Sequence, residues 1–370
     1  MRLESAVLHR VEMPLKFLFK TSFGETTKKR FLLLEVRSQG LTGLGECVAE
    51  EDPFYSWETI ETARHVLSRH LLPLVLGRDL ESPKDLPPLV ARVRGHRMAK
   101  GALDAAVWDL FAKSEGVSLS SYLGGVRESV EVGVSLGMAP SAAAAVENVA
   151  KHVAQGYRRI KLKIEPGCDV ERLEAVRAAF PAIVLTVDAN AAYRDEDFAH
   201  IASMDRFALD YMEQPLHYED LDRHAALAKT LATPICLDES IRSAADTRLA
   251  LALGSCRVVN VKLGRVGGYS EALAIQDVVQ AAGVPLWCGG MLEAGVGRAH
   301  NVALASLPSF TKPGDTASSS RYFADDIVEP ALEATDGLMP VPKGPGIGVE
   351  LRRDVLSRFT SEREEVSSHG

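Results

Sequence analysis

The sequence predicts an α/β protein whose larger part is a TIM-like barrel. From about residue 130 onward, short apolar runs alternate with longer, charge-bearing stretches of helical character. This alternation is typical of βαβ units on a parallel sheet, and eight such units favour closure of the sheet into a barrel. The chain has 370 residues, more than one ordinary core accommodates, so a second domain or additions to the barrel are expected.

Eight apolar runs supply the predicted strands. Seven are well marked and the eighth is weaker; they cover residues 131–136, 159–164, 183–188, 208–213, 235–238, 258–262, 284–288 and 309–311. Five consecutive runs carry a charged residue at the carboxyl end. Because the carboxyl ends of barrel strands form the active-site face, these charges predict where the chemistry lies.

The residues before the repeat, 1–125, predict a smaller α+β domain. An apolar strand at 30–38 is followed by Gly40, Gly43 and Gly45, which indicate a hairpin-like return of the chain.

A packed helix follows the hairpin. Small and apolar side chains recur at helical spacing between residues 98 and 114, which predicts a helix in close contact with its neighbours. The barrel is expected to take residues 126–320. The unit pattern is then lost, and a loop-rich segment with Pro and Gly, residues 321–370, is expected to pack back on the N-terminal domain.

The charge balance excludes several classes of partner. A net charge of −8 is a poor match for nucleic acid or for an anionic membrane. The first residues lack an apolar leader, and no apolar stretch is long enough to span a bilayer, so we expect a cytoplasmic protein. Five scattered cysteines, mostly inside apolar runs, indicate buried reduced thiols rather than disulfides or a zinc cluster.

Three carboxylates at near-even spacing predict a metal site. Asp188, Glu213 and Asp238 end three successive runs and are expected to converge at one mouth of the barrel. Three unpaired anions would repel one another, so a divalent cation is expected to neutralise them. Since the ligands are all oxygens, the expected ion is Mg²⁺, with Mn²⁺ or Co²⁺ as substitutes.

Lysines stand on both sides of the predicted ion. Lys161 and Lys163 share a strand face and point into the barrel mouth, and Lys262 ends the strand after the third ligand. An amine flanked by cations and partly buried has a lowered pKa and can act as a base. Removal of a proton α to a carboxylate, giving an enediolate, is the chemistry that these groups predict, with Lys163 as the base and Lys161 as its electrostatic partner.

Other polar residues are predicted to support the site. Asn190, on the face of Asp188, is either a hydrogen-bonding partner or a turn residue. Arg265 either lowers the pKa of Lys262 or pairs with Glu239; a surface position is the alternative.

These residues resemble the enolase superfamily, in which a lysine base works beside Mg²⁺. The Lys161-x-Lys163 pattern with Lys262 is similar to the muconate lactonizing enzyme subgroup, whereas a mandelate racemase type would carry a His at the end of the seventh strand. Further motifs resemble the o-succinylbenzoate synthase and N-succinylamino acid racemase family: residues 14–17, 21–24, 96–100, 135–137 and, most specific, 289–301 (GGMLEAGVGRAHN).

The resemblance implies a modified (β/α)7β barrel under an α+β capping domain made of both chain ends. Cap loops around residues 19–24 and 47–55 would close over the substrate and exclude water. The implied substrate contacts are Phe19, Ser22, Ser135, Gly290, Met291 and Leu292; the alternative for Ser135 is a packed strand residue.

The sequence departs from its relatives at a few positions. Leu18, Lys20 and Phe323 replace Arg, Glu and Trp of relatives, and residues 314–317 lack the Asp-x-Asp of dipeptide epimerases. These departures concern the preferred substrate side chain and not the chemistry.

Two reactions on a small carboxylate substrate are implied by the resemblance. One is racemisation of an N-succinylamino acid, in which Lys262 returns a proton to the opposite face. The other is the dehydration that forms o-succinylbenzoate in menaquinone biosynthesis. There are two alternatives. A hydrolytic metal barrel would normally have His ligands at strand ends, and a non-catalytic metal-binding barrel would lack one of the ligands or lysines. The family also implies a homo-oligomer, a dimer or octamer.

Overall fold

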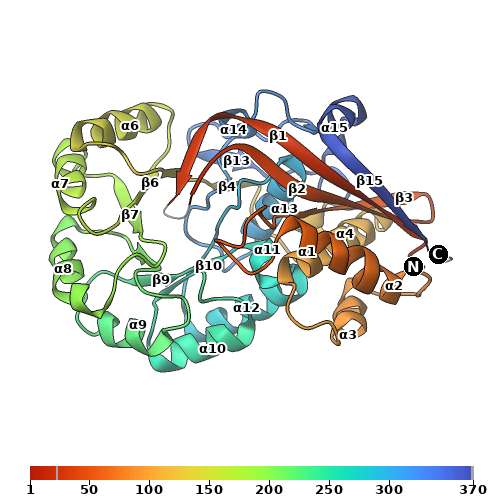
Figure 1. Cartoon of the computed structure of the whole chain (residues 1–370), viewed down its shortest axis with the longest axis horizontal. Helices are drawn as coiled ribbons and strands as arrows, with labels where there is room; N and C mark the ends of the chain where they lie inside the picture. Colours follow the sequence, from red (N-terminus) through yellow and green to blue (C-terminus); the bar gives the residue numbers. More distant parts are fainter. Residues whose placement is uncertain (22–23, 368–370) are drawn as a thin grey trace.

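A parallel β-barrel and an antiparallel cap make up the protein (Figure 1). The computed structural model describes residues 1–21 and 24–367. The predicted α/β architecture is confirmed. Both chain ends lie at the cap, at the end of the molecule remote from the outer barrel helices (Figure 1).

Seven parallel strands form the barrel sheet, each hydrogen-bonded to the next in chain order. They coincide with the first seven predicted runs, but most are shorter. They are β5 (Val134–Leu136), β6 (Arg159–Lys163), β7 (Val184–Asp188), β8 (Met212–Glu213), β9 (Ile235–Leu237), β10 (Val258–Val261) and β11 (Leu286–Cys288).

A helix follows each strand and packs its apolar side on the outside of the barrel (Figure 1). Several begin at an oxygen side chain that accepts a main-chain N–H, such as Ser141 and Ser243. The helices are α6 (Ala142–Ala154), α7 (Val170–Ala179), α8 (Phe198–Ser203), α9 (Leu221–Ala228), α10 (Ala244–Leu253), α12 (Tyr269–Ala282), preceded by the short α11 (Leu263–Val266), and α13 (Gly295–Ala305).

The eighth predicted strand closes the barrel through two isolated bridges instead of a continuous ladder. Phe310 makes a parallel bridge to Leu286 of β11, and Gly314 makes one to Val132, just before β5. The backbone N–H of Asp315 also donates to the carbonyl of Cys288, at 2.9 Å. The arrangement is therefore (β/α)7β.

The cap is built on a four-stranded antiparallel sheet. Its order is β15-β1-β2-β3, with β1 (Ser5–Thr21), β2 (Gly24–Ser38), β3 (Leu41–Cys47) and β15 (Thr360–Ser367). The hairpin predicted around Gly40 is the β2–β3 connection. Because β15 pairs with β1, the last strand of the chain completes the sheet of the first (Figure 1).

Helices cover one side of the cap sheet. The long helix predicted at residues 98–114 is α4 (Arg97–Ser114), and it is buried along most of its length. The others are α1 (Ile60–Val66), which runs on through a π-helical turn, Leu67–Leu71, into α2 (Leu72–Val75), and α3 (Leu86–Val90) and α5 (Leu119–Leu123).

The C-terminal segment has more regular structure than the loop-rich tail that the sequence predicts. It contains α14 (Ser319–Tyr322), β12 (Val328–Glu329), β13 (Leu338–Pro340), β14 (Glu350–Leu351), α15 (Arg353–Phe359) and β15. The Pro and Gly residues suggested loops, but pairing with β4 (Ser129–Glu131) and β1 supplies partners that only the folded chain provides.

Buried carboxyl groups of the cap bind the N-terminal ends of two barrel helices. Glu46 of β3 accepts N–H bonds from Ala294 and Gly297, at 2.9 and 2.8 Å, at the start of α13. Asp104 of α4 accepts bonds from Ser270 at the start of α12. Burial raises the pKa of Glu46 to about 8 and that of Asp104 to about 7. These bonds fix the cap against the barrel.

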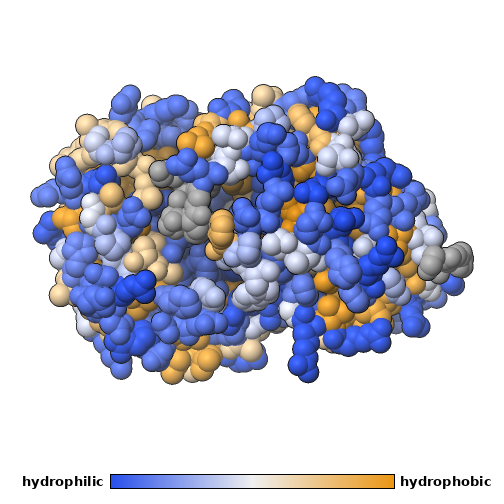
Figure 2. All heavy atoms as spheres, in the orientation of Figure 1, coloured by the Kyte–Doolittle hydropathy of each residue, from blue (hydrophilic) through white to orange (hydrophobic). Residues whose placement is uncertain are grey.

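The face shown in Figure 2 is mainly hydrophilic, with apolar side chains scattered in small groups. No helix within the described residues is both long and apolar enough to cross a bilayer.

We expect Gly45→Ala to destabilise the fold, because α4 lies directly against this strand. A Cβ at Gly45 would stand 1.9 Å from the carbonyl oxygen of Ala102. Forced overpacking of this kind should lower the free energy of unfolding by about 1–3 kcal/mol. Urea denaturation measures the loss, with Thr42→Ala on the same strand as a control. Equal stability of Gly45→Ala and wild type would contradict the close contact.

Glu35 should make stability depend on acid pH. Burial alone would raise the pKa of this carboxyl, but hydrogen bonds from His9 and Arg353 outweigh burial and hold it at about 2. A folded-state pKa below the unfolded value stabilises the protein above about pH 4.5, and this contribution is lost as the pH falls toward 2. In Glu35→Gln we expect that contribution, about 1–3 kcal/mol, to be absent. Denaturation from pH 7 to 2.5 tests it; an unchanged slope below pH 4.5 would refute the assignment.

Candidate active site

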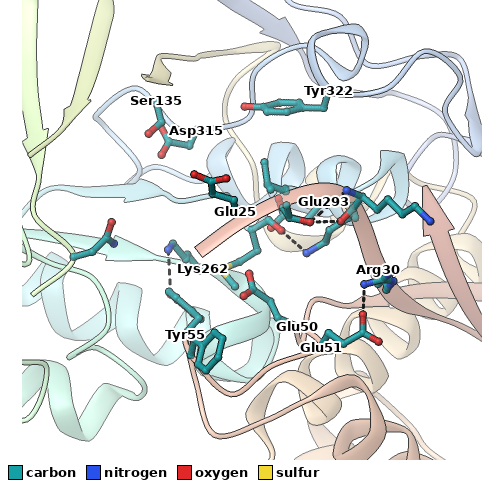
Figure 3. A pocket seen from close by; sticks show the side chains of 18 of the residues that line it. Glu25, Arg30, Glu50, Glu51, Tyr55, Ser135, Lys262, Glu293, Asp315 and Tyr322 are labelled. Carbon is teal, nitrogen blue, oxygen red and sulfur yellow. Dashed lines mark hydrogen bonds and ion pairs between the residues drawn. The ribbon is translucent and has the colours of Figure 1, made fainter. Parts of the chain in front are cut away.

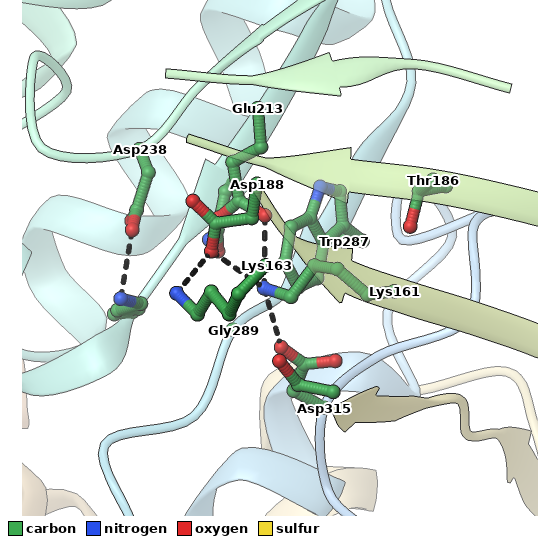
Figure 4. Close-up of polar contacts among 12 residues, drawn as sticks. Lys161, Lys163, Thr186, Asp188, Glu213, Asp238, Trp287, Gly289 and Asp315 are labelled. Atoms are coloured by element: carbon green, nitrogen blue, oxygen red, sulfur yellow. Dashed lines mark hydrogen bonds and ion pairs between the residues drawn. The ribbon is translucent and has the colours of Figure 1, made fainter. Parts of the chain in front are cut away.

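The three predicted metal ligands lie side by side at the carboxyl ends of adjacent strands (Figure 4). Asp188 ends β7, Glu213 ends β8, and Asp238 follows β9; all three are buried. Asp188 and Glu213 are paired residues in the β7–β8 register. Burial and the neighbouring charge of Asp188 raise the pKa of Glu213.

Lys161 lies among carboxylates inside the barrel. Its Nζ is 2.8 Å from Glu213, 3.3 Å from Asp188 and 2.8 Å from Asp315 (Figure 4). The ammonium also lies 4.8 Å from the centre of the Trp287 ring. Burial would lower the pKa of Lys161, but Asp315 and Glu213 outweigh it and raise the pKa well above its usual value. Lys161 is therefore a fixed positive charge.

Lys163 lies nearer the mouth, on the same strand face. Its Nζ is 2.6 Å from Asp188 Oδ2, and it donates to Asn190 Oδ1. The side chain is 12% exposed, more than that of Lys161, and it lines the central cavity. Both amines of β6 line the cavity, and Lys163 is the more exposed of the two.

Lys262 approaches from the other side of the carboxylates, immediately after β10. Its Nζ is 2.8 Å from Asp238 and 3.0 Å from the Tyr55 hydroxyl of the cap. Burial would lower the pKa of Lys262, but Tyr55 and the charge of Glu239 outweigh burial and raise it. The sequence suggested a lowered pKa for this amine. That prediction is wrong for the arrangement seen here, because the acidic neighbours outweigh the effect of burial.

Arg265 differs from the prediction. It is buried, so the surface alternative is wrong, and it contacts Asp238 instead of Glu239. It also donates to the carbonyls of Ile241 and Asn260, at 2.9 and 2.6 Å. The turn of α11 aims the guanidinium back at the third carboxylate, which sequence separation alone does not show.

Asn190 is placed next to the site as a hydrogen-bonding residue. Its backbone N–H donates to Asp188 Oδ1 at 3.0 Å, and its amide donates to Glu239 Oε1 at 3.1 Å. Its φ of 43° also puts it in a left-handed turn. Both readings of this residue therefore hold together: the turn presents the amide to the carboxylates.

The oxygens of Asp188, Glu213 and Asp238 suit a hard divalent cation. In this structure, lysine ammonium groups lie between these carboxylates. Within residues 1–21 and 24–367, no three Asp, Glu, His or Cys side chains meet as a ready-made metal centre. However, Asp188 and Glu213 already turn oxygens toward one positive charge, the ammonium of Lys161. Buried carboxylate oxygens without sulfur or nitrogen ligands favour Mg²⁺ over zinc.

A cavity of about 440 Å³ opens over the site between barrel and cap (Figure 3). Both parts of the chain contribute: Lys262, Ser135 and Glu293 come from the barrel side and Tyr55 from the cap. The predicted substrate contacts Ser135, Gly290, Met291 and Leu292 all line it.

Two further predicted contacts fall where the structure gives no side-chain detail. Ser22 lies outside the described residues, and Phe19 is placed only by its backbone pairing with Thr26.

Two residues at the site were not predicted from the sequence, Asn260 and Asp315. Asn260 donates to Glu213 Oε1 at 2.8 Å, and it lies two residues before Lys262 on the same strand, so period-2 spacing could have revealed it. Asp315 pairs with Arg159 and Lys161, but the weak eighth run hid it. Gly289, the first residue of the 289–301 motif, leaves room for the amide of Asn260, since a Cβ there would lie 2.3 Å from its oxygen.

Comparison with known families agrees with this geometry. Residues 144–355 match the model described as enolase C-terminal domain-like, and residues 4–124 match the N-terminal domain of mandelate racemase / muconate lactonizing enzyme. The chain belongs to the enolase superfamily. The resemblance to this superfamily inferred from the sequence is thereby confirmed.

Relatives of high identity span the whole chain. An N-succinylamino acid racemase of Thermus thermophilus is 55% identical and covers 100% of both chains. An o-succinylbenzoate synthase of Geobacillus kaustophilus is 50% identical over 97% of this chain and 96% of its own. The crystal structure of an enolase superfamily member from Listeria innocua superposes with a TM-score of 0.97 at 44% identity, covering 100% of both chains. The chain is an enzyme of this superfamily, whose members generally depend on a divalent cation.

Proposed function

We propose that this enzyme removes the proton α to a carboxylate, acting as an N-succinylamino acid racemase with o-succinylbenzoate synthase activity. The observation that carries the proposal is the placing of two lysines, Lys163 and Lys262, on either side of three buried carboxylates at one cavity. The names of the full-length relatives support both reactions.

The two lysines would act on opposite faces of the substrate. Lys163 takes the α-proton from one enantiomer, and Lys262 delivers a proton to the other face, so the configuration inverts. The reverse reaction exchanges the two roles. Each amine must be neutral when it accepts a proton, and the enediolate must be held by positive charge while it exists. The fixed cation Lys161 supplies part of that charge.

We propose that Asp188, Glu213 and Asp238 hold a divalent cation, Mg²⁺ in the first instance, with Mn²⁺ or Co²⁺ as substitutes. When bound, it would supply positive charge beside the carboxylate of the substrate. Asn260 and Asn190 hold the ligand oxygens of Glu213 and Asp188 in place through the hydrogen bonds described above.

Synthesis of o-succinylbenzoate as the main role is the second candidate, because a relative at 50% identity carries that name. In that reaction, Lys163 removes the α-proton and the intermediate loses water to become aromatic. Lys262 need not transfer a proton and holds the anion as a cation over its face. The same side chains therefore serve both reactions.

The hydrolytic alternative gains no support from the site. His152, His200 and His224 lie on barrel helices, away from the strand ends. The non-catalytic alternative requires a missing ligand or lysine, and all of these are present. Cytoplasmic location, a role in menaquinone biosynthesis and assembly as a homo-oligomer stay predictions from the sequence.

Replacing either lysine should abolish racemisation. We expect Lys163→Ala and Lys262→Ala each to lower kcat by about 10²–10⁴-fold or more, since each removes one proton-transfer group. Deuterium exchange at the α-carbon, followed separately for the two enantiomers, shows which face each lysine serves. Lys262→Arg keeps the charge without an acid-base function and should spare the synthase reaction more than the racemase reaction.

A matched control for the lysine variants is Lys312→Ala, which removes a lysine that pairs with Asp210 outside the cavity. It should leave both activities unchanged. Retention of racemisation in both Lys163→Ala and Lys262→Ala would overturn the proposed function.

Mg²⁺ should stabilise the protein by binding the carboxylates. We expect Mg²⁺ added to chelator-treated protein to raise the free energy of unfolding by about 2.7 kcal/mol at 100 times its Kd. Glu213→Gln should weaken this effect, whereas Asp246→Asn, which alters an ion pair on α10, should not. Thermal unfolding against Mg²⁺ concentration provides the measurement, and the absence of any shift in the wild type would contradict the assigned ligands.

A further inference from the structure

Lys29 is a buried lysine of the cap that lines the substrate cavity without an acidic partner. It lies on β2, and its residue is only 4% exposed. Its ammonium donates a 2.8 Å hydrogen bond to the main-chain oxygen of Met291. No carboxylate of the described residues lies within the 4.0 Å of an ion pair. An ammonium has three donors, so Lys29 retains capacity for a further acceptor.

A second buried cation stands on the same wall. Arg298 of α13 is 2% exposed and also lines the cavity. It donates to main-chain oxygens, those of Glu293, at 2.9 Å, and Ala317, and forms no ion pair within the described part of the chain. Its guanidinium lies 5.1 Å from the centre of the Tyr322 ring.

Neither cation forms an ion pair with an acid of the described residues. Glu293 lines the cavity and supplies one carboxylate. Glu46 lies nearby, and burial and the charge of Glu293 raise its pKa to about 8. Lys29 and Arg298 are therefore buried charges without an ion-pair partner in the described part of the chain, and such a charge is costly. An anionic group entering the cavity would remove that cost.

The wall lies within reach of the reacting centre along one loop. Gly289 packs on Lys262, where a Cβ would stand 2.8 Å from the lysine Cγ. Met291, two residues later, is the residue that Lys29 holds. A substrate with its α-carbon between the two catalytic lysines would extend an arm along residues 289–293 toward Lys29.

We propose that Lys29 binds a distal carboxylate on the acyl arm of the substrate. The enzyme would then select acyl groups derived from dicarboxylic acids over simple acyl groups. This inference rests on the proposed function and adds the residue that binds the distal end of the acyl group.

The test compares two ligands that differ only in the distal carboxylate, N-succinyl- and N-acetyl-phenylalanine. With the Mg²⁺-loaded enzyme, we expect Lys29→Met to lower kcat/KM for the N-succinyl substrate about 10- to 100-fold, the effect of one lost charged hydrogen bond. The N-acetyl substrate should change less than about threefold. Lys29→Gln, which keeps a donor for Met291, should show the same selective loss, and Lys29→Arg should restore most of the activity.

Lys343→Met is the control, because Lys343 does not line the cavity and pairs with Glu128 at the surface. It should leave the preference unchanged. An equal loss of kcat/KM on both substrates in Lys29→Met and Lys29→Gln would show that Lys29 only supports the loop. Unchanged kinetics would show that Lys29 has no role. Either result overturns the proposal. Calorimetry measures the binding of the two ligands without any reaction, so it tests the role of Lys29 independently of the proposed function. The preference for the N-succinyl ligand must vanish in Lys29→Gln, even if the enzyme exchanges no α-proton.

Discussion

Neutralisation of buried carboxylates at the barrel mouth is the constraint on which the rest of the structure depends. Asp188, Glu213 and Asp238 lie where water cannot solvate them, so positive groups must approach from several strands. Lys161 and Lys262 do so from opposite sides, and Asp315 in turn balances Lys161 from the closing segment. The barrel has to close for these charges to meet, which ties its fold to its chemistry.

The cap takes part in the site through its contacts with the barrel. Small residues such as Gly45 let α4 lie directly on β3, and α4 also packs against α11, the turn that follows Lys262. Glu46 joins the cap sheet to the start of α13, and Lys29 holds the loop before that helix. The wall of the cavity is therefore positioned from the cap, while the reacting amines are positioned from the barrel.

This division explains how relatives of similar sequence carry the names of two reactions. In the proposed mechanism, proton removal needs Lys163 and the buried carboxylates, and both reactions share these groups. The choice between inversion and loss of water depends on which substrate fits between the amines, so it lies with the cavity wall. Gly290, Met291 and the cap loops shape that wall and thus bear on substrate choice.

The sequence by itself determined the barrel and the even series of charged residues from Lys161 to Lys262, because strand period and strand-end position are local properties. Only the tertiary structure decided the partners. Arg265 meets Asp238, Asp315 meets Lys161, and Lys29 meets the Met291 carbonyl across long stretches of chain. The bridges made by the weak eighth run and the pairing of β15 with β1 were also decided there, since both depend on neighbours brought together by closure. Contacts between distant segments depend on three-dimensional packing, which local spacing does not encode.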